Sequence, residues 1–176
     1  MECLFLNRTY ILDTETTGLE DNDEILQLSI INGLGDICYN SYYKPIYKKE
    51  WPEAEKVNHI TPEKVKDCNL FIEACIPAFE IIEQGQAIVG YNLPFDLRMI
   101  KNNRASALLP AGIKYIDCMP AMKKLITAPW VSLVTASKHF NYQPTGDFHD
   151  SIEDCRATLH VFKSLCEAEA LPYRLI

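Results

Sequence analysis

Two carboxylates follow a short apolar run near the start of the sequence, in the stretch YILDTETTGLE (residues 10–20). Asp13 and Glu15 are two positions apart, so on a β-strand both side chains would point to the same face. Two like charges held together repel each other and lose hydration. Divalent Mg²⁺ or Mn²⁺ ions, which favour carboxylate oxygens, would compensate both effects. The simpler alternative is an exposed turn with solvated acids.

A second acidic stretch, HDSIEDC (residues 149–155), begins a long amphipathic segment. Asp154 aligns at helical spacing with Val161 and Leu165, beside the main apolar stripe, so its carboxylate is expected to point toward the protein. A buried carboxylate needs a hydrogen-bonding partner or a metal ion. The alternative is helix capping, since SIED fits the capping pattern with Ser151 as the cap.

His149 precedes Asp154 by five residues. Five helical steps would turn the two side chains apart, so the histidine is expected in the loop before the helix. There it could swing over a site that Asp154 helps to build. An imidazole has an unperturbed pKa of about 6.5, which suits proton removal near neutral pH. A histidine in such a loop can equally be an ordinary surface residue.

A further acid, Asp96, lies in the stretch GYNLPFDLRMI (residues 90–100). Pro94 fits the first turn of a helix, which places Asp96 in that same turn. An acid there complements the helix dipole, and this simple interpretation is sufficient for Asp96 taken alone.

The order of the surrounding elements predicts how these side chains are positioned. Three strands come first, joined in part by the glycine-containing hairpin loop at 32–36, and helices then alternate with strands. This order favours a mixed sheet with helices on its faces. The expected strands are 10–13, 24–31, 37–44, 87–91 and 114–118, and the expected helices are 61–65, 70–84 with a kink at Pro77, 94–104, 119–126, 132–140 and 151–168. We also expect Thr61 and Asp117 to cap helices and Phe95 to pack in the core.

Bulk composition restricts the class of protein. The length of 176 residues fits one domain spanning 1–176, and no apolar run approaches the roughly 20 residues that cross a bilayer. The seven cysteines form no C-x-x-C pair, which argues against structural zinc and suits a reducing, cytoplasmic compartment. The net charge of −7 argues against a polyanionic partner, but two bound divalent cations would offset four of those charges.

Taken together, DTETTG (13–18), GYNLPFD (90–96) and HDSIEDC (149–155) resemble the three exonuclease motifs of the DEDDh family, the DnaQ-like 3′→5′ exonucleases. The motifs occur in the family order and extend over almost the whole chain. The H-x₄-D spacing of the third motif marks the DEDDh branch rather than the branch with a tyrosine at that position.

This resemblance implies an α/β, ribonuclease-H-like fold with a mixed five-stranded sheet flanked by helices. It implies that Asp13, Glu15 and Asp154 hold one metal ion directly, that Asp13 bridges to a second, and that Asp96 acts partly through water. His149 would be the general base. The implied cofactors are two divalent cations, Mg²⁺ or Mn²⁺, which position water and neutralise charge at a phosphodiester.

Four further residues are implied to contact the substrate. Backbone groups around Thr16 and Thr17 would hold the terminal nucleotide, and Leu19 would wedge against its base. His59 in NHITPE (58–63) would approach the substrate, although an ordinary loop or cap role fits it equally well.

The leading functional prediction is therefore a metal-dependent exonuclease that releases nucleoside 5′-monophosphates from a free 3′ end, with single-stranded DNA favoured as substrate. An oligoribonuclease-type RNA exonuclease is the nearest alternative. A non-catalytic nucleic-acid-binding module would not require all four acids and the histidine, and a structural cation site would not require His149. A polymerase or another DNA-processing protein is the expected partner, and no membrane is involved.

Overall fold

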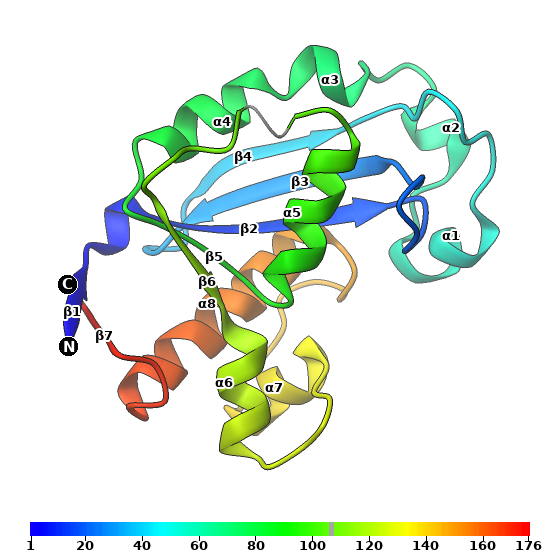
Figure 1. The fold of residues 1–176 in the computed structure, drawn as a ribbon. Helices are drawn as coiled ribbons and strands as arrows, with labels where there is room; N and C mark the ends of the chain where they lie inside the picture. The colour runs from blue at the N-terminus through cyan, green and yellow to red at the C-terminus, as the bar shows by residue number, and fades with distance from the viewer. Residues whose placement is uncertain (106–107) are drawn as a thin grey trace.

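Strand β2 is the central strand of a five-stranded mixed sheet in the computed structural model, which describes residues 1–105 and 108–176 (Figure 1). It pairs antiparallel with β3 and parallel with β5, while β4 and β6 form the two edges. This confirms the expected mixed sheet. The strand bounds are β2 (Thr9–Thr16), β3 (Ile25–Asn32), β4 (Ile37–Tyr42), β5 (Ala87–Gly90) and β6 (Lys114–Asp117).

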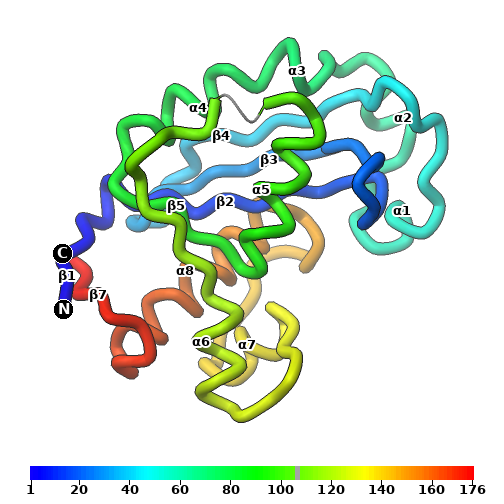
Figure 2. The backbone as a smooth tube through the Cα atoms, in the orientation of Figure 1, coloured from blue at the N-terminus to red at the C-terminus, as the bar shows by residue number. Residues whose placement is uncertain are grey.

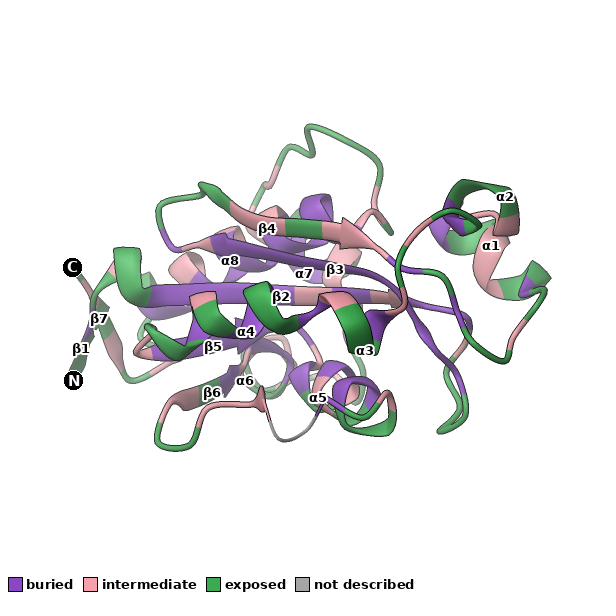
Figure 3. Ribbon diagram, turned by 90° about the horizontal axis from the view of Figure 1, so that it is seen from above, coloured by how far each residue is buried: buried purple, intermediate pink, exposed green. Residues whose placement is uncertain are grey.

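Alternate residues of β2 pack into two separate hydrophobic cores. Ile11 belongs to the core beneath helix α8 (Ser151–Glu167), whereas Tyr10 and Leu12 belong to the core on the opposite face. Burial on both faces explains why β2 begins as an unbroken apolar run (Figure 3). The helices α6 (Cys118–Leu125) and α7 (Leu133–His139) complete the α8 layer, and α3 (Phe71–Ala74), α4 (Ile76–Glu83) and α5 (Leu93–Asn102) form the other.

Helices α1 (Pro52–Asn58) and α2 (Pro62–Val65) lie beyond the C-terminal end of β2 (Figure 1). The expected cap at Thr61 is confirmed, because its side chain accepts a hydrogen bond from the Lys64 N–H. Helix α1 was not expected from the sequence. It is short and largely exposed, so it has no apolar stripe strong enough to reveal it.

Three other features concern the expected elements. The predicted helix 70–84 is two helices, α3 and α4, and Pro77 occupies the first turn of the second, where a kink within one helix was expected. Asp117 caps α6 by accepting the Met119 N–H, as expected. A short parallel pair of strands, β1 (Glu2–Leu4) and β7 (Tyr173–Leu175), was missed and brings the two termini together (Figure 2). Such three-residue strands leave too little alternation to detect.

Across the described residues, no helix combines the length and apolarity required to span a membrane.

Candidate active site

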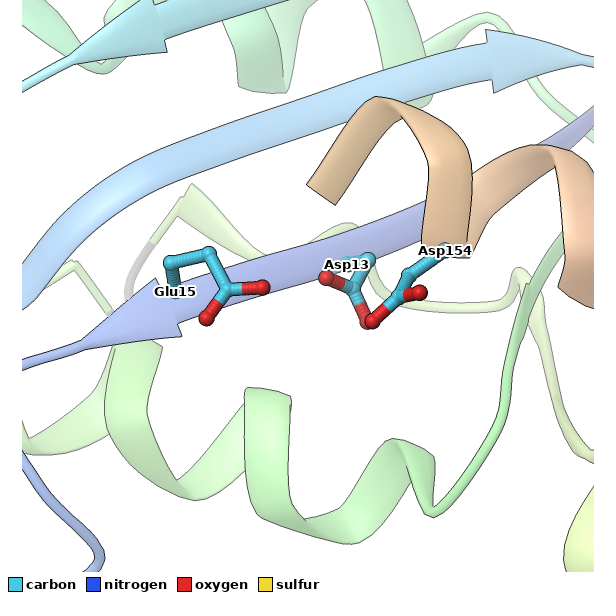
Figure 4. Close-up of side chains that lie close together, drawn as sticks. All are labelled: Asp13, Glu15 and Asp154. Carbon is cyan, nitrogen blue, oxygen red and sulfur yellow. The ribbon is translucent and has the colours of Figure 1, made fainter. Parts of the chain in front are cut away.

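Asp13 and Glu15 project from β2 on the same side as Ile11, toward helix α8. Asp154 reaches this pair from the first turn of α8, and Figure 4 shows its carboxylate beside that of Asp13. One carboxylate oxygen from each of the three residues lies within 4.8 Å of the other two. The structure therefore brings together three of the four acids that the motifs indicate.

The N-terminus of α8 differs in one respect from the expected capping pattern. Asp150 is the cap, since its carboxylate accepts the Ile152 N–H at 2.9 Å. Ser151 is already helical and fully buried, and its hydroxyl is hydrogen-bonded to that of Ser29 on β3. The alternative in which Ser151 caps the helix is therefore wrong. Asp154 is not the N-cap residue, and its side chain is buried, as its alignment with the apolar residues predicts.

Asp96 lies in the first turn of α5 and is only 3% exposed. Its Oδ1 accepts two hydrogen bonds from Thr14, one from the backbone N–H at 3.0 Å and one from the hydroxyl at 2.7 Å. These contacts hold Asp96 beside β2, at Thr14, the residue that follows Asp13. Asp96 is not part of the three-carboxylate cluster, so its position suits a less direct role at the same site.

Burial makes ionisation of these carboxyl groups unfavourable. It raises the pKa of Asp13 well above its usual range, and the neighbouring charges of Asp96 and Asp154 raise it further. Burial, with the nearby Asp154 and Asp96, raises the pKa of Glu15 to about 9. Burial likewise raises the pKa values of Asp96 and Asp154 to about 7.

Two observations show that this group of acids suits a hard divalent cation. The Oδ2 atom of Asp13 is buried without a hydrogen-bonding partner, so its preference for a positive partner is unmet by the protein. Within the described part of the chain, no lysine or arginine forms a salt bridge with Asp13, Glu15, Asp96 or Asp154. Carboxylate oxygens are the ligands that Mg²⁺ and Mn²⁺ prefer.

His149 lies in the loop directly before α8, as the sequence predicts, with an exposed side chain and a left-handed backbone (φ 70°). Its backbone N–H points to Asp154 Oδ1 at 3.4 Å. Desolvation lowers the pKa of the imidazole, and the positive form of nearby His59 lowers it further. The neutral ring, which can accept a proton, is therefore favoured near pH 7.

Glu153 anchors the loop that leads to His149, a role that the sequence did not reveal. The side chain is 2% exposed, and its carboxylate accepts hydrogen bonds from the Tyr142 hydroxyl at 2.7 Å and from the Thr145 N–H and hydroxyl at 3.1 and 2.9 Å. Arg156 lies 3.6 Å from the same carboxylate. Tyr142 and Thr145 precede Glu153 by eleven and eight residues in an irregular segment, so no periodic pattern relates them to it.

A surface hollow of about 710 Å³ adjoins the acids and is lined by the loop after β2 and by α1. Thr16, Thr17 and Leu19 all line it, and Leu19 is 72% exposed at its surface. The Thr16 hydroxyl donates to the Gly18 carbonyl at 2.6 Å. His59 does not line this hollow. It ends α1 in a left-handed conformation (φ 56°), close enough to His149 to influence its pKa.

Two buried polar residues that sequence reasoning missed hold the loop of Thr16 and Thr17 in place. Asn58 donates from Nδ2 to the Thr16 carbonyl at 3.1 Å. Asp23 accepts the Thr17 hydroxyl and the Glu20 N–H, both at 2.8 Å, and forms a salt bridge with Lys48 at 3.1 Å. These contacts tie the loop that lines the hollow to buried side chains.

Comparison with known proteins places this geometry in context. The family model RNase_T, described as "Exonuclease", matches residues 10–162, which include all four acids and His149. The uncharacterized exonuclease CP81 of Escherichia phage 186 is 29% identical over 90% of this chain and 88% of its own. The DNA polymerase III subunit epsilon of Rickettsia typhi is 26% identical over 96% of this chain and 78% of its own.

A solved structure shows the same fold. The nuclease domain of 3′hExo, described as a DEDDh family member bound to rAMP, superposes with a TM-score of 0.73 over 94% of both chains. Its sequence identity is 12%, so the similarity concerns the arrangement of the elements.

Proposed function

This chain belongs to the exonuclease family, as a DnaQ-like member of the DEDDh type, and we propose that it hydrolyses single-stranded DNA from a free 3′ end and releases nucleoside 5′-monophosphates. The observation that carries the proposal is the cluster of Asp13, Glu15 and Asp154 beside His149. A binding module would have no need to bury three mutually repelling carboxylates and to place a histidine next to them.

The acids would hold divalent cations, Mg²⁺ or Mn²⁺. Asp13, Glu15 and Asp154 would supply carboxylate oxygens directly, and Asp96, held by Thr14, would contribute from beside β2. Two such ions, when bound, neutralise the charge that develops on the attacking and leaving oxygens of a phosphodiester. The β2 register and the first turn of α8 fix these carboxylates before any ligand arrives, so little reorganisation is required.

His149 would act as the general base. Its ring is neutral near pH 7, because desolvation and His59 both lower its pKa, and it can therefore take a proton from the attacking water. The contact of its backbone N–H with Asp154, and the anchoring of its loop by Glu153, hold the backbone of His149 beside Asp154, and from there the ring would reach the attacking water. Proton transfer from water would thus occur next to the scissile phosphate.

The hollow beside the acids would receive the 3′-terminal nucleotide. Backbone groups at Thr16 and Thr17 would contact the terminal 3′-hydroxyl, and the exposed Leu19 would pack against the last base. His59, outside the hollow but near His149, would approach the substrate from the α1 side. A 3′-phosphate would add negative charge beside Asp13 and Glu15, so a free hydroxyl is preferred.

DNA is favoured as substrate because a relative over 96% of the chain is a DNA polymerase III subunit. The same comparison supports a polymerase or another DNA-processing protein as partner. An RNA exonuclease is the alternative, since the DEDDh domain with the same fold holds rAMP. All seven cysteines are free, which fits a reducing compartment such as the cytoplasm.

The deciding experiment compares 3′-hydroxyl DNA and RNA strands of the same sequence, each labelled at the 5′ end, with Asp13→Asn as the inactive control. Both strands are used at equal concentration, first with Mg²⁺ and then with Mn²⁺. We expect the wild-type protein to shorten the DNA strand faster than the RNA strand. Faster degradation of the RNA strand would contradict the proposed DNA preference and identify RNA as the preferred substrate. Binding of either strand without any hydrolysis would reject the enzyme in favour of a binding module.

A further inference from the structure

A second hollow, of about 370 Å³, lies next to the one that Leu19 lines. Four lysines line it, and no acidic residue does. The rest of its lining is apolar except for backbone, with Trp51 and Leu70 among the side chains. We call this hollow the lysine groove, defined by Lys44, Lys48, Lys49 and Lys66. The protein has a net charge of −7, so a hollow lined by four lysines differs in the sign of its charge from the protein as a whole.

The lysine groove is continuous with the proposed site of the 3′-terminal nucleotide. Lys48 and Trp51 line both hollows. A polymer whose end lies between Leu19 and α1 can therefore leave that hollow past Lys48 and Trp51 and enter the groove. Residues of α1 line the first hollow and residues of α2 line the second, and both helices lie beyond the end of β2 (Figure 1).

The wall of the groove is held in position by a buried acid. Glu24 is 7% exposed, and its carboxylate accepts the backbone N–H groups of Ile46, Tyr47 and Lys48 at 2.6, 2.9 and 2.8 Å. The backbone on either side is also fixed. The Lys44 N–H donates to the Asn69 carbonyl at 3.0 Å, and the Trp51 indole N–H donates to the Ile60 carbonyl at 2.6 Å. A preorganised wall loses little entropy when a ligand binds.

The four lysines of the groove differ in whether they already form ion pairs. Lys48 pairs with Asp23, and Lys66 pairs with Glu63. Lys44 and Lys49 are exposed, and among the residues that the structure describes neither forms a salt bridge with a carboxylate. Lys49 donates only to the carbonyl of Ile46, at 3.2 Å. These two ammonium groups can bind an anion without first breaking an ion pair.

We infer that the lysine groove binds the phosphodiester backbone of the strand upstream of its 3′-terminal nucleotide. The inference rests on the proposed function. Flexible lysines interact with phosphates as point charges and do not discriminate bases, so the contact would be independent of sequence. Trp51 is only 4% exposed, so its ring forms part of the base of the groove. Because the faces of the ring are covered, bases cannot stack on it.

The test is the double variant Lys44→Ser/Lys49→Ser, assayed on strands from two to twelve nucleotides with one common 3′ sequence. The matched control is Lys163→Ser/Arg174→Ser, which removes the same charge from α8 and β7, at the other end of the molecule (Figure 1). We expect the groove variant to lose about tenfold in kcat/KM on the twelve-nucleotide strand and to retain wild-type kcat/KM on the dinucleotide, while the control variant behaves as wild type.

A binding measurement separates this inference from the proposed function. Anisotropy of a fluorescent twelve-nucleotide strand should give a slope of log Kd against log salt that is smaller by roughly 1.4 in the groove variant, at about 0.7 for each lost phosphate contact. If the strand binds with this difference but is never hydrolysed, the groove stands and the proposed function fails. An equal loss for strands of every length, an unchanged slope, or equally tight lysine-dependent binding of polyglutamate would overturn the groove assignment.

Discussion

The backbone N–H of His149 points at the carboxylate of Asp154, with 3.4 Å between the nitrogen and Oδ1. The backbone of the residue proposed as general base thereby contacts one of the three clustered acids. Asp154 also faces Asp13 across the gap between α8 and β2 (Figure 4). Changes at Asp154 are therefore expected to affect both metal binding and the position of the base.

Substitution of Asp154 by Asn should abolish activity without unfolding the protein. The amide keeps the oxygen that accepts the His149 N–H but removes a charge that burial disfavours. We expect turnover to fall by more than the 10- to 100-fold typical of outer-shell metal partners, about 10³-fold or beyond. In chelator, thermal melting should show equal or higher stability than wild type. Near-normal turnover would instead limit Asp154 to a structural role in α8.

Substitution of His149 by Ala should lower turnover by about 10²- to 10⁴-fold, the usual contribution of a general base. The acids are unchanged, so the stabilisation of the fold by added Mn²⁺, followed by thermal melting, should remain. His139→Ala, at an exposed histidine on α7, is the matched control and should behave as wild type. Loss of Mn²⁺ stabilisation in His149→Ala, as strong as in Asp13→Ala, would identify His149 as a ligand rather than a base.

Substitution of Glu153 by Gln should reduce turnover by about 10- to 100-fold, because one of the two oxygens that accept hydrogen bonds from Thr145 becomes an NH₂ group, which cannot accept. Metal binding should be preserved, since Glu153 is outside the clustered carboxylates. The measurement pairs kcat with Mn²⁺-dependent melting. An exposed acid on α4, Glu80, supplies the control Glu80→Gln. A parallel loss of turnover and metal binding would show that Glu153 supports the acids and not the loop of His149.

The metal-free protein should become more stable as the pH falls from about 9 toward 5. The pKa of Glu15 is raised to about 9 and those of Asp96 and Asp154 to about 7, so the folded state binds more protons than the unfolded chain in this range. Stability then decreases as pH rises through these values. Thermal melting in chelator at a series of pH values checks the sign, and Mg²⁺ should reduce the trend. Higher stability at pH 9 than at pH 6 without metal would contradict the repulsion among the acids.

The sequence was informative where periodicity and chemistry agree. The apolar run before Asp13 predicts a strand buried on both faces, and the alignment of Asp154 with Val161 and Leu165 predicts an inward carboxylate. Both are confirmed by the structure. Pro62 and Pro94 each predict the first turn of a helix, and both lie there, because proline suits that position. Pro77 predicts a kink within one helix, and the structure instead begins a separate helix there.

Contacts between irregular segments could not be predicted in the same way. The hydrogen bonds of Glu153 to the Thr145 N–H and of Glu24 to the backbone of residues 46–48 join side chains to backbone groups that no repeating pattern relates. The alternative role of Ser151 as a helix cap is wrong, because a capping pattern records only sequence spacing. Burial against Ser29 on a strand more than a hundred residues away decides its position.

The most direct test of the central claim follows a DNA strand labelled at its 5′ end and carrying a free 3′-hydroxyl. With Mg²⁺ or Mn²⁺ the account predicts a ladder of strands shortened one nucleotide at a time from the 3′ end, with release of nucleoside 5′-monophosphates. Chelator should stop the reaction reversibly, and strands with a 3′-phosphate should resist it. Rapid cutting of a closed circular single strand by the pure protein, or full activity in excess chelator, would contradict a metal-dependent site built for a 3′ end.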